Sequence, residues 1–387
     1  MKTIYLYGQI SSKVFFMSLA LKSVTACLIC LGLNIFSGNS LLYSQTSVVK
    51  GVWLTNVASN ALDSRDSIKE AVRVCREYGI NHIFVVVWNR ARTMYPSLVM
   101  EREFGIPIIE KFSGRDPLKE VIEEAHASGI KVHAWFEFGF SCSYEDETGG
   151  IIIEKYPHWA AINNMGKLVS KNGFQWMNAF NPQVQEFISS LIKEVAINYN
   201  IDGIQGDDRL PAVPLESGYD LYTTNLYKSE HDGALPPQDY KDSTWINWRA
   251  DLLTDYLGRL YREIKIIKPD LVVSMAPSIH PWAKAQYLQD WPEWMARGYV
   301  DILLPQVYRY NIESYRATLL EQIKYLKPGE KEIFFPGILL QVNDKNIPTD
   351  KFLREMILEN RKNGIKGESF FFFEGLKKYP KEIFLEK

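Results

Sequence analysis

The segment 116–138, DPLKEVIEEAHASGIKVHAWFEF, contains one complete helix, turn and strand. Asp116 stands before a proline, which is typical of a helix start, because aspartate caps free N–H groups and proline suits the first turn. Apolar residues then recur at helical spacing as far as Gly129, a typical helix end. The residues that follow alternate in side-chain character like a strand. The segment therefore predicts a helix over 117–128 and a strand over 131–138.

The same unit recurs on both sides of this segment. Eight apolar strands alternate with amphipathic helices, which predicts an α/β fold, specifically a (β/α)8 TIM barrel. The predicted strands are 51–56, 82–88, 131–138, 202–208, 271–276, 301–308, 332–338 and 368–373. The predicted helices are 66–78, 117–128, 182–199, 244–267, 292–297, 313–326 and 349–363. An open doubly wound sheet is the alternative, but no glycine-rich nucleotide loop follows any strand.

Composition narrows the class of protein. The chain has 387 residues, 46% of them hydrophobic and 23% charged, which is typical of a globular protein large enough for one barrel. Lys and Arg total 44 against 46 Asp and Glu. This balance gives no basic surface for a phosphate backbone, so nucleic acid is not an expected partner.

The first 45 residues differ from the rest, with three lysines, no acidic residue and apolar runs that end in small residues. They predict a secretory signal cleaved near Ser44, and hence a protein exported to the periplasm or cell surface whose residues 46–387 form a single barrel. The segment is long for a signal, and translation from Met17 would shorten it to a usual length. An uncleaved membrane anchor and a lipid attached to Cys27 are the alternatives.

Two cysteines lie outside this leader. Cys75 lies on the apolar face of a predicted helix and Cys142 in a predicted loop. We expect two free thiols, with a single disulfide as the alternative.

The connections between the predicted elements are unequal in length. Links from helix to strand are short, whereas the links from strand to helix at 89–115, 139–181 and 209–243 are long. In a barrel these long loops share the C-terminal face, where active sites lie. Long loops rich in Trp, Tyr and Asn on that face predict a cleft for an extended ligand.

Strand alternation predicts which side chains of 131–138 point inward. His133, Trp135 and Glu137 form the inward set, and Glu137 stands at the top of the strand. A carboxyl at the barrel mouth is a candidate general acid or base. Its structural alternative is a salt bridge to Arg90 or Arg92.

The fourth strand ends in DGIQGDDR, residues 202–209. Adjacent carboxylates followed by an arginine are costly at a strand end unless they are used or paired. Asp207 shares a face with the inward polar residues and is predicted to be functional. Asp208 either contacts substrate, pairs with Arg209 or anchors the loop. A calcium site is a further alternative, but the ligand spacing of a calcium loop is missing.

Glu374 stands at the C-terminal end of the last strand, where catalytic residues of barrels lie. Alternatively, it caps a short helix that begins near Leu376. Cleavage of a glycosidic bond needs two carboxyls, one with a raised pKa. Asp207 and Glu374 are the preferred pair, with Glu137 as the third candidate. No metal or other cofactor is predicted, and no H-x-H pair for a metal occurs. No G-x-S-x-G elbow for a serine nucleophile occurs either.

Further polar and aromatic residues at strand tops are candidates for contact with substrate. Core filling is the alternative for each tryptophan among them. The candidates are Trp53, Asn56, Trp88, Asn89, Arg90, Asp208, His280, Trp282, Gln306 and Tyr308.

Several motifs together resemble glycosyl-hydrolase-like family ten, a family of exported bacterial barrel proteins. The motifs are GVWLTN at 51–56, VVWNR at 86–90, MYPS at 94–97, AWFE at 134–137, DGIQGDD at 202–208, PQVY at 305–308 and FFFE at 371–374. The resemblance implies a TIM barrel with glycosidase activity, and at least one member acts on peptidoglycan glycan strands stripped of peptides. It marks Glu137, Asp207, Asp208 and Glu374 as the acidic positions at the barrel mouth.

Two positions depart from related patterns. Gly206 stands where the family often has a bulky residue. The fourth strand also loosely resembles family-18 chitinases, but Arg209 occupies the place of their catalytic glutamate, which argues against a substrate-assisted mechanism.

Together the residues and the resemblance predict a hydrolase of a polysaccharide, peptidoglycan glycan or a related amino-sugar polymer of the bacterial envelope. A barrel that binds envelope glycan without cleaving it is the alternative, and a transglycosylase is a third hypothesis.

Overall fold

The computed structural model describes residues 48–341 and 347–385. The predicted signal, the start at Met17 and the anchor at Cys27 all lie outside these residues. Within the described residues no helix is both long and apolar enough to cross a bilayer.

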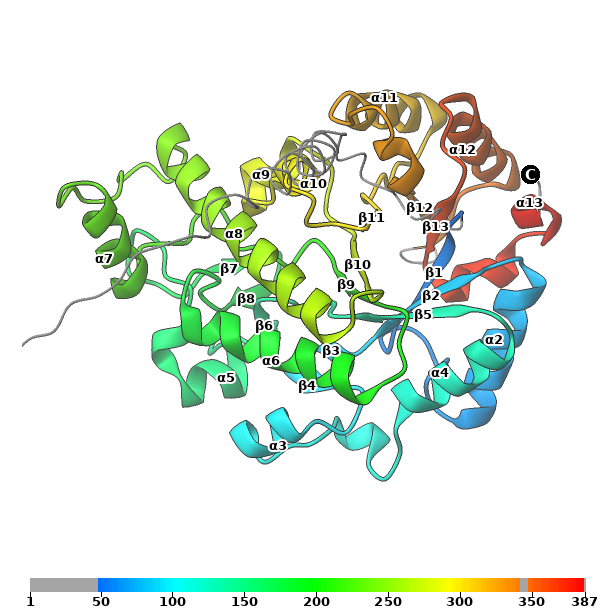
Figure 1. The fold of residues 1–387 in the computed structure, drawn as a ribbon, viewed down its shortest axis with the longest axis horizontal. Helices are drawn as coiled ribbons and strands as arrows, with labels where there is room; N and C mark the ends of the chain where they lie inside the picture. The colour runs from blue at the N-terminus through cyan, green and yellow to red at the C-terminus, as the bar shows by residue number, and fades with distance from the viewer. Residues whose placement is uncertain (1–47, 342–346, 386–387) are drawn as a thin grey trace, which may run out of the picture. The chain divides into compact units, whose positions relative to one another are not determined.

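A single sheet of eight parallel strands forms the centre of the molecule (Figure 1). The strands run in the order β11, β10, β9, β5, β2, β1, β13, β12. Parallel bridges from Leu303 to Phe334 and from Gln306 to Gly337 join the two ends of this order. The (β/α)8 prediction is therefore confirmed. The bounds are β1 Lys50–Leu54, β2 His82–Val86, β5 Lys131–Trp135, β9 Gly203–Gly206, β10 Val272–Met275, β11 Ile302–Leu303, β12 Gly337–Leu339 and β13 Glu368–Phe371.

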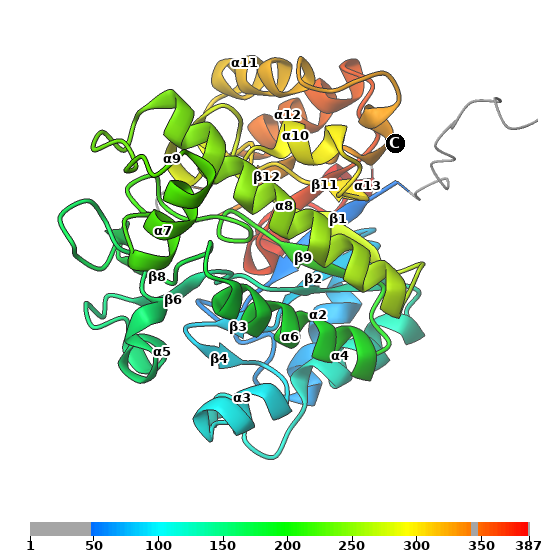
Figure 2. The ribbon, with the colours of Figure 1, turned by 60° about the vertical axis from the view of Figure 1, so that its left-hand side comes forward.

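Helices follow the strands and cover the outside of the sheet, which lies between two groups of them in Figure 2. Asp116 caps α4 as expected, because its carboxylate accepts the backbone N–H of Lys119 at 3.1 Å. The covering helices are α2 Arg65–Glu77, α4 Pro117–Ala127, α6 Pro182–Asn198, α8 Ser243–Ile267, α10 Trp291–Ala296, α11 Ile312–Ile323, α12 Asp350–Lys362 and α13 Glu382–Leu385.

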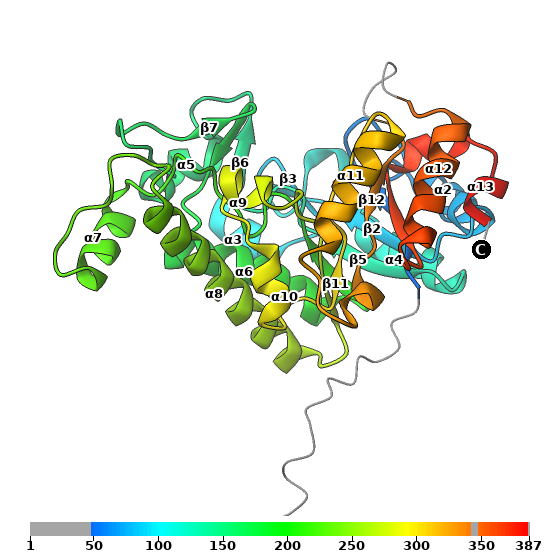
Figure 3. The same ribbon diagram turned by 90° about the horizontal axis from the view of Figure 1, so that it is seen from above.

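The long loops after the strands carry small elements of their own, which the sequence did not predict. Figure 3 shows α5, α7 and the β6–β8–β7 sheet gathered at one end of the barrel. These elements are β3 Trp88–Asn89, β4 Arg92–Thr93, α3 Leu98–Phe104, β6 Ser141–Tyr144, α5 Gly150–Lys155, β7 Ser170–Lys171, β8 Phe174–Trp176, α7 Leu221–Glu230 and α9 Trp282–Tyr287.

One strand prediction is displaced. The sequence predicted a strand over 332–338, but Glu330–Ile333 form a turn of 3-10 helix and β12 begins at Gly337. The carboxylate of Glu330 accepts the backbone N–H of Lys327 at 2.6 Å, which fixes this turn. Phe334 and Phe335 still fill the core, and Phe334 bridges in parallel to Leu303, so the predicted strand is shortened and shifted rather than absent.

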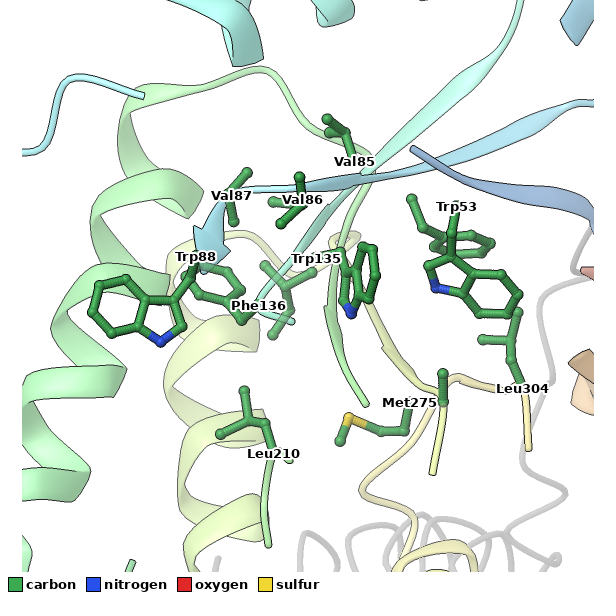
Figure 4. Packing of buried hydrophobic residues seen from close by; sticks show 14 of the residues in the cluster. Trp53, Val85, Val86, Val87, Trp88, Trp135, Phe136, Leu210, Met275 and Leu304 are labelled. Carbon is green, nitrogen blue, oxygen red and sulfur yellow. The ribbon is translucent and has the colours of Figure 1, made fainter. Parts of the chain in front are cut away.

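Tryptophans occupy both faces of the strands (Figure 4). Trp53 and Trp135 lie inside the barrel, and the Trp53 indole donates to Oε1 of Gln205 at 2.7 Å. Trp88 instead points outward and meets Phe187 of α6 at 5.9 Å between ring centroids. Cys75 and Cys142 are buried free thiols, as expected.

Candidate active site

Glu137 follows β5 by two residues and continues its inward-facing set, on the C-terminal side of the barrel. Asn89, from the β3–β4 hairpin, donates its side-chain N–H to Oε2 of Glu137. The side chain of Glu137 keeps 16% of its surface exposed. A ligand in the barrel mouth can therefore reach this carboxyl.

Asp207 lies directly after β9 and is almost completely enclosed, with 3% of its side chain exposed. Its Oδ1 accepts the backbone N–H of Arg209 at 2.9 Å. Its Oδ2 accepts the Trp135 indole N–H at 3.0 Å and the Arg209 guanidinium at 3.2 Å. Because both oxygens are occupied by donors, Asp207 is held as an internal anchor.

The Arg209 guanidinium joins three carboxyl groups. It lies 3.2 Å from Asp207, 3.3 Å from Asp208 and 3.7 Å from Glu137. Its Nε also donates to the backbone carbonyl of Glu137 at 2.7 Å, which ties the end of β5 to the turn after β9. We call Glu137, Asp207, Asp208 and Arg209 the carboxylate cluster. Asp208 is its most exposed carboxylate, at 27% of the side chain.

The structure corrects one of the two ion-pair partners that the sequence predicted for the carboxyl groups. Asp208 does pair with Arg209, but Glu137 pairs with Arg209 rather than with Arg90 or Arg92. The Arg90 guanidinium lies 5.1 Å from the centre of the Tyr144 ring, and Arg92 donates to the carbonyl of Ala91 at 2.9 Å.

Close packing explains the glycine at position 206. A Cβ atom there would lie 2.5 Å from the carbonyl oxygen of Leu210 and 2.7 Å from the Met275 methyl. The chain folds back tightly after β9, so that Leu210 lies over the strand it has just left. A bulky residue at 206 would force this turn, and with it the carboxylate cluster, outward.

Burial controls ionisation in the cluster. It raises the pKa of Glu137, although Arg209 and the Asn89 amide oppose this shift. Burial also raises the pKa of Asp207, again opposed by Arg209. A raised pKa suits a carboxyl to act as a general acid.

Glu374 lies apart from the carboxylate cluster. It stands in the first turn of a 3-10 helix, Phe373–Lys378, and accepts the Ser59 hydroxyl at 2.7 Å. Within residues 48–341 and 347–385, no hydrogen bond or ion pair joins Glu374 to Asp207. The pairing of Asp207 with Glu374 therefore stays a prediction.

The predicted substrate-contacting residues divide into buried and accessible groups. Trp53 and Trp88 are 1% and 0% exposed, so they fill the core, which is the alternative that the sequence left open for each tryptophan. Asn89 is buried as the support of Glu137. His280 packs between Trp291 and Tyr325, with ring centroids at 6.0 and 4.5 Å, rather than beside the cluster.

The accessible group lies around the mouth. Trp282 is 47% exposed, and its ring centroid is 5.6 Å from that of Tyr287. Tyr308 is half-buried. Burial raises the pKa of its hydroxyl, and Asp208 and Asp207 raise it further. Arg90 is exposed, Asn56 lines a pocket beside Glu374, and Gln306 donates to the carbonyl of Ala276 at 3.0 Å.

Two residues of the site were missed from sequence. Gln289 is fully buried and donates to the carbonyls of Asp207 at 2.8 Å and Pro211 at 3.3 Å, which holds the turn after β9. The Tyr287 hydroxyl accepts the side-chain N–H of Asn172 at 2.9 Å. Burial, together with Asp208, raises the pKa of Tyr287 to about 12. Neither residue follows a strand directly. A search for polar residues at the C-terminal ends of predicted strands could therefore not select them.

In the part of the chain that the structure describes, no group of three or more His, Cys, Asp or Glu side chains is placed to hold a metal ion.

The model of the glycosyl hydrolase-like 10 family matches residues 48–352. The chain belongs to this family. It is 23% identical over 331 residues to the glycosyl hydrolase DigH of Escherichia coli strain K12, covering 76% of this chain and 73% of that protein. It is 21% identical over 373 residues to the glycosyl hydrolase YngK of Bacillus subtilis strain 168, covering 86% and 69%.

Solved structures share the fold. The PgaB (BpsB) glycoside hydrolase domain of Bordetella bronchiseptica superposes with a TM-score of 0.65 at 12% identity, covering 87% of this chain and 97% of that domain. The α-L-fucosidase isoenzyme 2 of Paenibacillus thiaminolyticus gives a TM-score of 0.62 at 18% identity, covering 87% and 48%. The enzyme class that family and fold support together is glycoside hydrolase.

Proposed function

We propose that this protein is an exported glycoside hydrolase that cleaves the glycan strands of peptidoglycan or a related amino-sugar polymer. The observation that carries the proposal is Arg209, which gathers a protonatable and an exposed carboxyl at the mouth of a barrel. Cleavage of a glycosidic bond by two carboxyls requires such a pair.

Glu137 is the proposed general acid. Burial raises its pKa, and its accessible edge faces the mouth. The acid donates its proton to the glycosidic oxygen as the bond to the anomeric carbon breaks.

Asp208 is the proposed second carboxyl. It is the most exposed member of the cluster, and the Arg209 guanidinium stabilises its charge from 3.3 Å. From there it acts on the anomeric carbon, directly or through a water molecule. Asp207 supports the pair by fixing Arg209 and Trp135.

The assignment drawn from sequence, Asp207 with Glu374, is the competing one. It would place one working carboxyl in a site with 3% exposure and the other beside Ser59. The two assignments differ in the expected effect of Glu374→Gln. The competing pair predicts a loss of kcat, whereas the pair Glu137 and Asp208 predicts a change confined to substrate binding.

The proposed substrate contacts lie on the rim. The exposed Trp282 ring offers an apolar face for a sugar, and the buried Tyr287 ring supports it from behind. Arg90 and Tyr308 offer polar groups on other loops of the same face.

The test is release of new reducing ends from peptide-free peptidoglycan glycan strands by the protein beginning at Gln45. Glu137→Gln is the inactive variant, and Glu101→Gln, exposed on α3, is the matched control. Release by wild type and control but not by Glu137→Gln supports hydrolysis. Retention of glycan in a pull-down without new ends would favour the binding barrel instead.

Export is tested separately. A mass spectrum of the protein recovered from the periplasm or cell surface is expected to begin at Gln45. A chain that begins at Met17 or earlier would contradict cleavage near Ser44.

A further inference from the structure

A polar cavity opens on the C-terminal face of the barrel. It has a volume of about 530 Å³ and lies where β1, β13 and β12 end. In the closed ring of strands, β13 stands four places from β9 in either direction. The cavity and the carboxylate cluster therefore belong to opposite sides of one mouth. Its polar lining is Asn56, Ser59, Asn60, Lys111, Gln341, Glu374 and Lys378, and we call it the β13 pocket.

Two oxygen atoms in the β13 pocket have no hydrogen-bond partner among the residues that the structure describes. They are Oδ1 of Asn56 and Oε1 of Gln341, and both are buried. Buried acceptors without a donor are unfavourable, so a ligand that brings hydroxyl or amide N–H groups gains by meeting them. Glu374 is a third acceptor, to which only Ser59 donates among the hydrogen bonds of the described residues. The pocket therefore favours a ligand rich in donors, as a sugar is.

The β13 pocket and the carboxylate cluster differ in the cation that each offers to a ligand. Lys378 is exposed and forms no ion pair within the described chain, and Lys111 pairs with Asp63 at 2.5 Å. Across the mouth, Arg209 faces three carboxyls. An anionic group on a ligand is therefore attracted to Lys378, whereas Arg209 is already occupied by carboxyl groups.

We propose that the β13 pocket is a subsite for a sugar residue that carries a carboxylate. The hydroxyl and amide donors of the sugar meet Asn56, Gln341 and Glu374, and its carboxylate pairs with Lys378. The inference rests on the proposed function in taking the ligand from the same glycan. In a polymer whose acidic and neutral sugars alternate, this subsite sets the register, because the acidic residue is held at Lys378.

The test is an NMR titration that needs no turnover. The probes are the methyl glycoside of N-acetylmuramic acid and its carboxyl-reduced alcohol, which differ only in the charged group. Wild type should bind the acid about three- to fivefold more tightly than the alcohol, as expected for one exposed charge pair. Lys378→Gln should abolish this preference. Gln341→Leu should weaken both probes to a similar extent.

Lys377→Gln is the matched control, because Lys377 lies on the same turn but donates to Glu70 at 3.2 Å. It should keep the preference for the acid. Equal affinity of wild type for the two probes, or an unchanged preference in Lys378→Gln, would overturn the subsite. Selective binding without release of reducing ends would instead contradict the hydrolase and leave the subsite standing.

Discussion

The Trp135 indole donates a hydrogen bond of 3.0 Å to Oδ2 of Asp207, and this bond ties the inward face of β5 to the turn after β9. The same carboxylate holds the guanidinium of Arg209, which in turn reaches Glu137 and Asp208. An enclosed carboxylate thus positions two others that face the mouth. This relationship separates the residues that hold the site from those that would touch a glycan.

Glu137→Gln should stabilise the fold while it removes activity. Burial raises the pKa of Glu137 above 4.5, so the folded state keeps a proton that the unfolded state releases once the pH exceeds 4.5. Stability contributed by this group is therefore present at low pH and lost as the pH rises through the raised value. The neutral amide escapes this loss. At pH 8 the variant should melt about 1–3 °C higher than wild type.

Thermal melts of both proteins between pH 4 and pH 9 check this expectation. The difference in Tm should shrink toward pH 4, where both states of the wild type are protonated. A variant that melts below wild type at pH 8 would show that the pairing of Glu137 with Arg209 outweighs its burial.

Gln289→Met removes the donor that holds the turn after β9 while keeping side-chain volume. Two backbone carbonyls lose a partner, so the free energy of unfolding should fall by about 1–3 kcal/mol. Loosening the turn should also lower kcat more than it changes KM. Gln238→Met, at an exposed position, is the control. Urea melts and steady-state kinetics measure both effects, and an unchanged kcat would refute a role in positioning.

Two tryptophans chosen from sequence for the same role should behave differently. Trp88→Ala leaves a cavity against Phe187 and should cost about 3–5 kcal/mol of stability. Trp282→Ala removes an exposed ring and should leave stability nearly unchanged while weakening glycan retention. Denaturant melts and a glycan pull-down separate the two effects. Equal loss of stability in both variants would contradict the assignment of Trp282 to the rim.

The two thiols should resist labelling in the folded protein. Cys142 and Cys75 are buried, and burial raises the pKa of Cys142 to about 12, so little thiolate forms at neutral pH. A thiol reagent should modify neither residue until the protein unfolds, and then modify two sites per chain that begins at Gln45. A single mass consistent with a disulfide would contradict the structure.

Local sequence predicted the parts of the fold that depend on local physics. The cap at Asp116 and the alternation of His133, Trp135 and Glu137 follow from spacing, and both appear in the structure. The sheet β6–β8–β7 was missed because its strands have two to four residues and exist only through pairing with one another. Such pairing has no signature in a short run of residues.

The candidate site likewise has residues that local sequence predicts and features that depend on tertiary packing. Asp207 to Arg209 were found because charged neighbours at a strand end are conspicuous. That Asp207 is enclosed while Asp208 is partly exposed depends on Trp135 and on the close turn at Gly206, which are tertiary facts. Trp88 and Trp282 look alike in sequence, and only packing distinguishes a core ring from a rim ring.

The most direct test of the account is kcat on peptide-free glycan strands for wild type, Glu137→Gln, Asp208→Asn and Glu374→Gln, with Glu101→Gln as control. Loss of acid or base assistance should lower kcat by about 10²–10⁴-fold in the first two variants. Glu374→Gln should keep kcat and raise KM. Wild-type kcat in Glu137→Gln, together with a large loss in Glu374→Gln, would contradict the assignment of the working carboxyls to the carboxylate cluster.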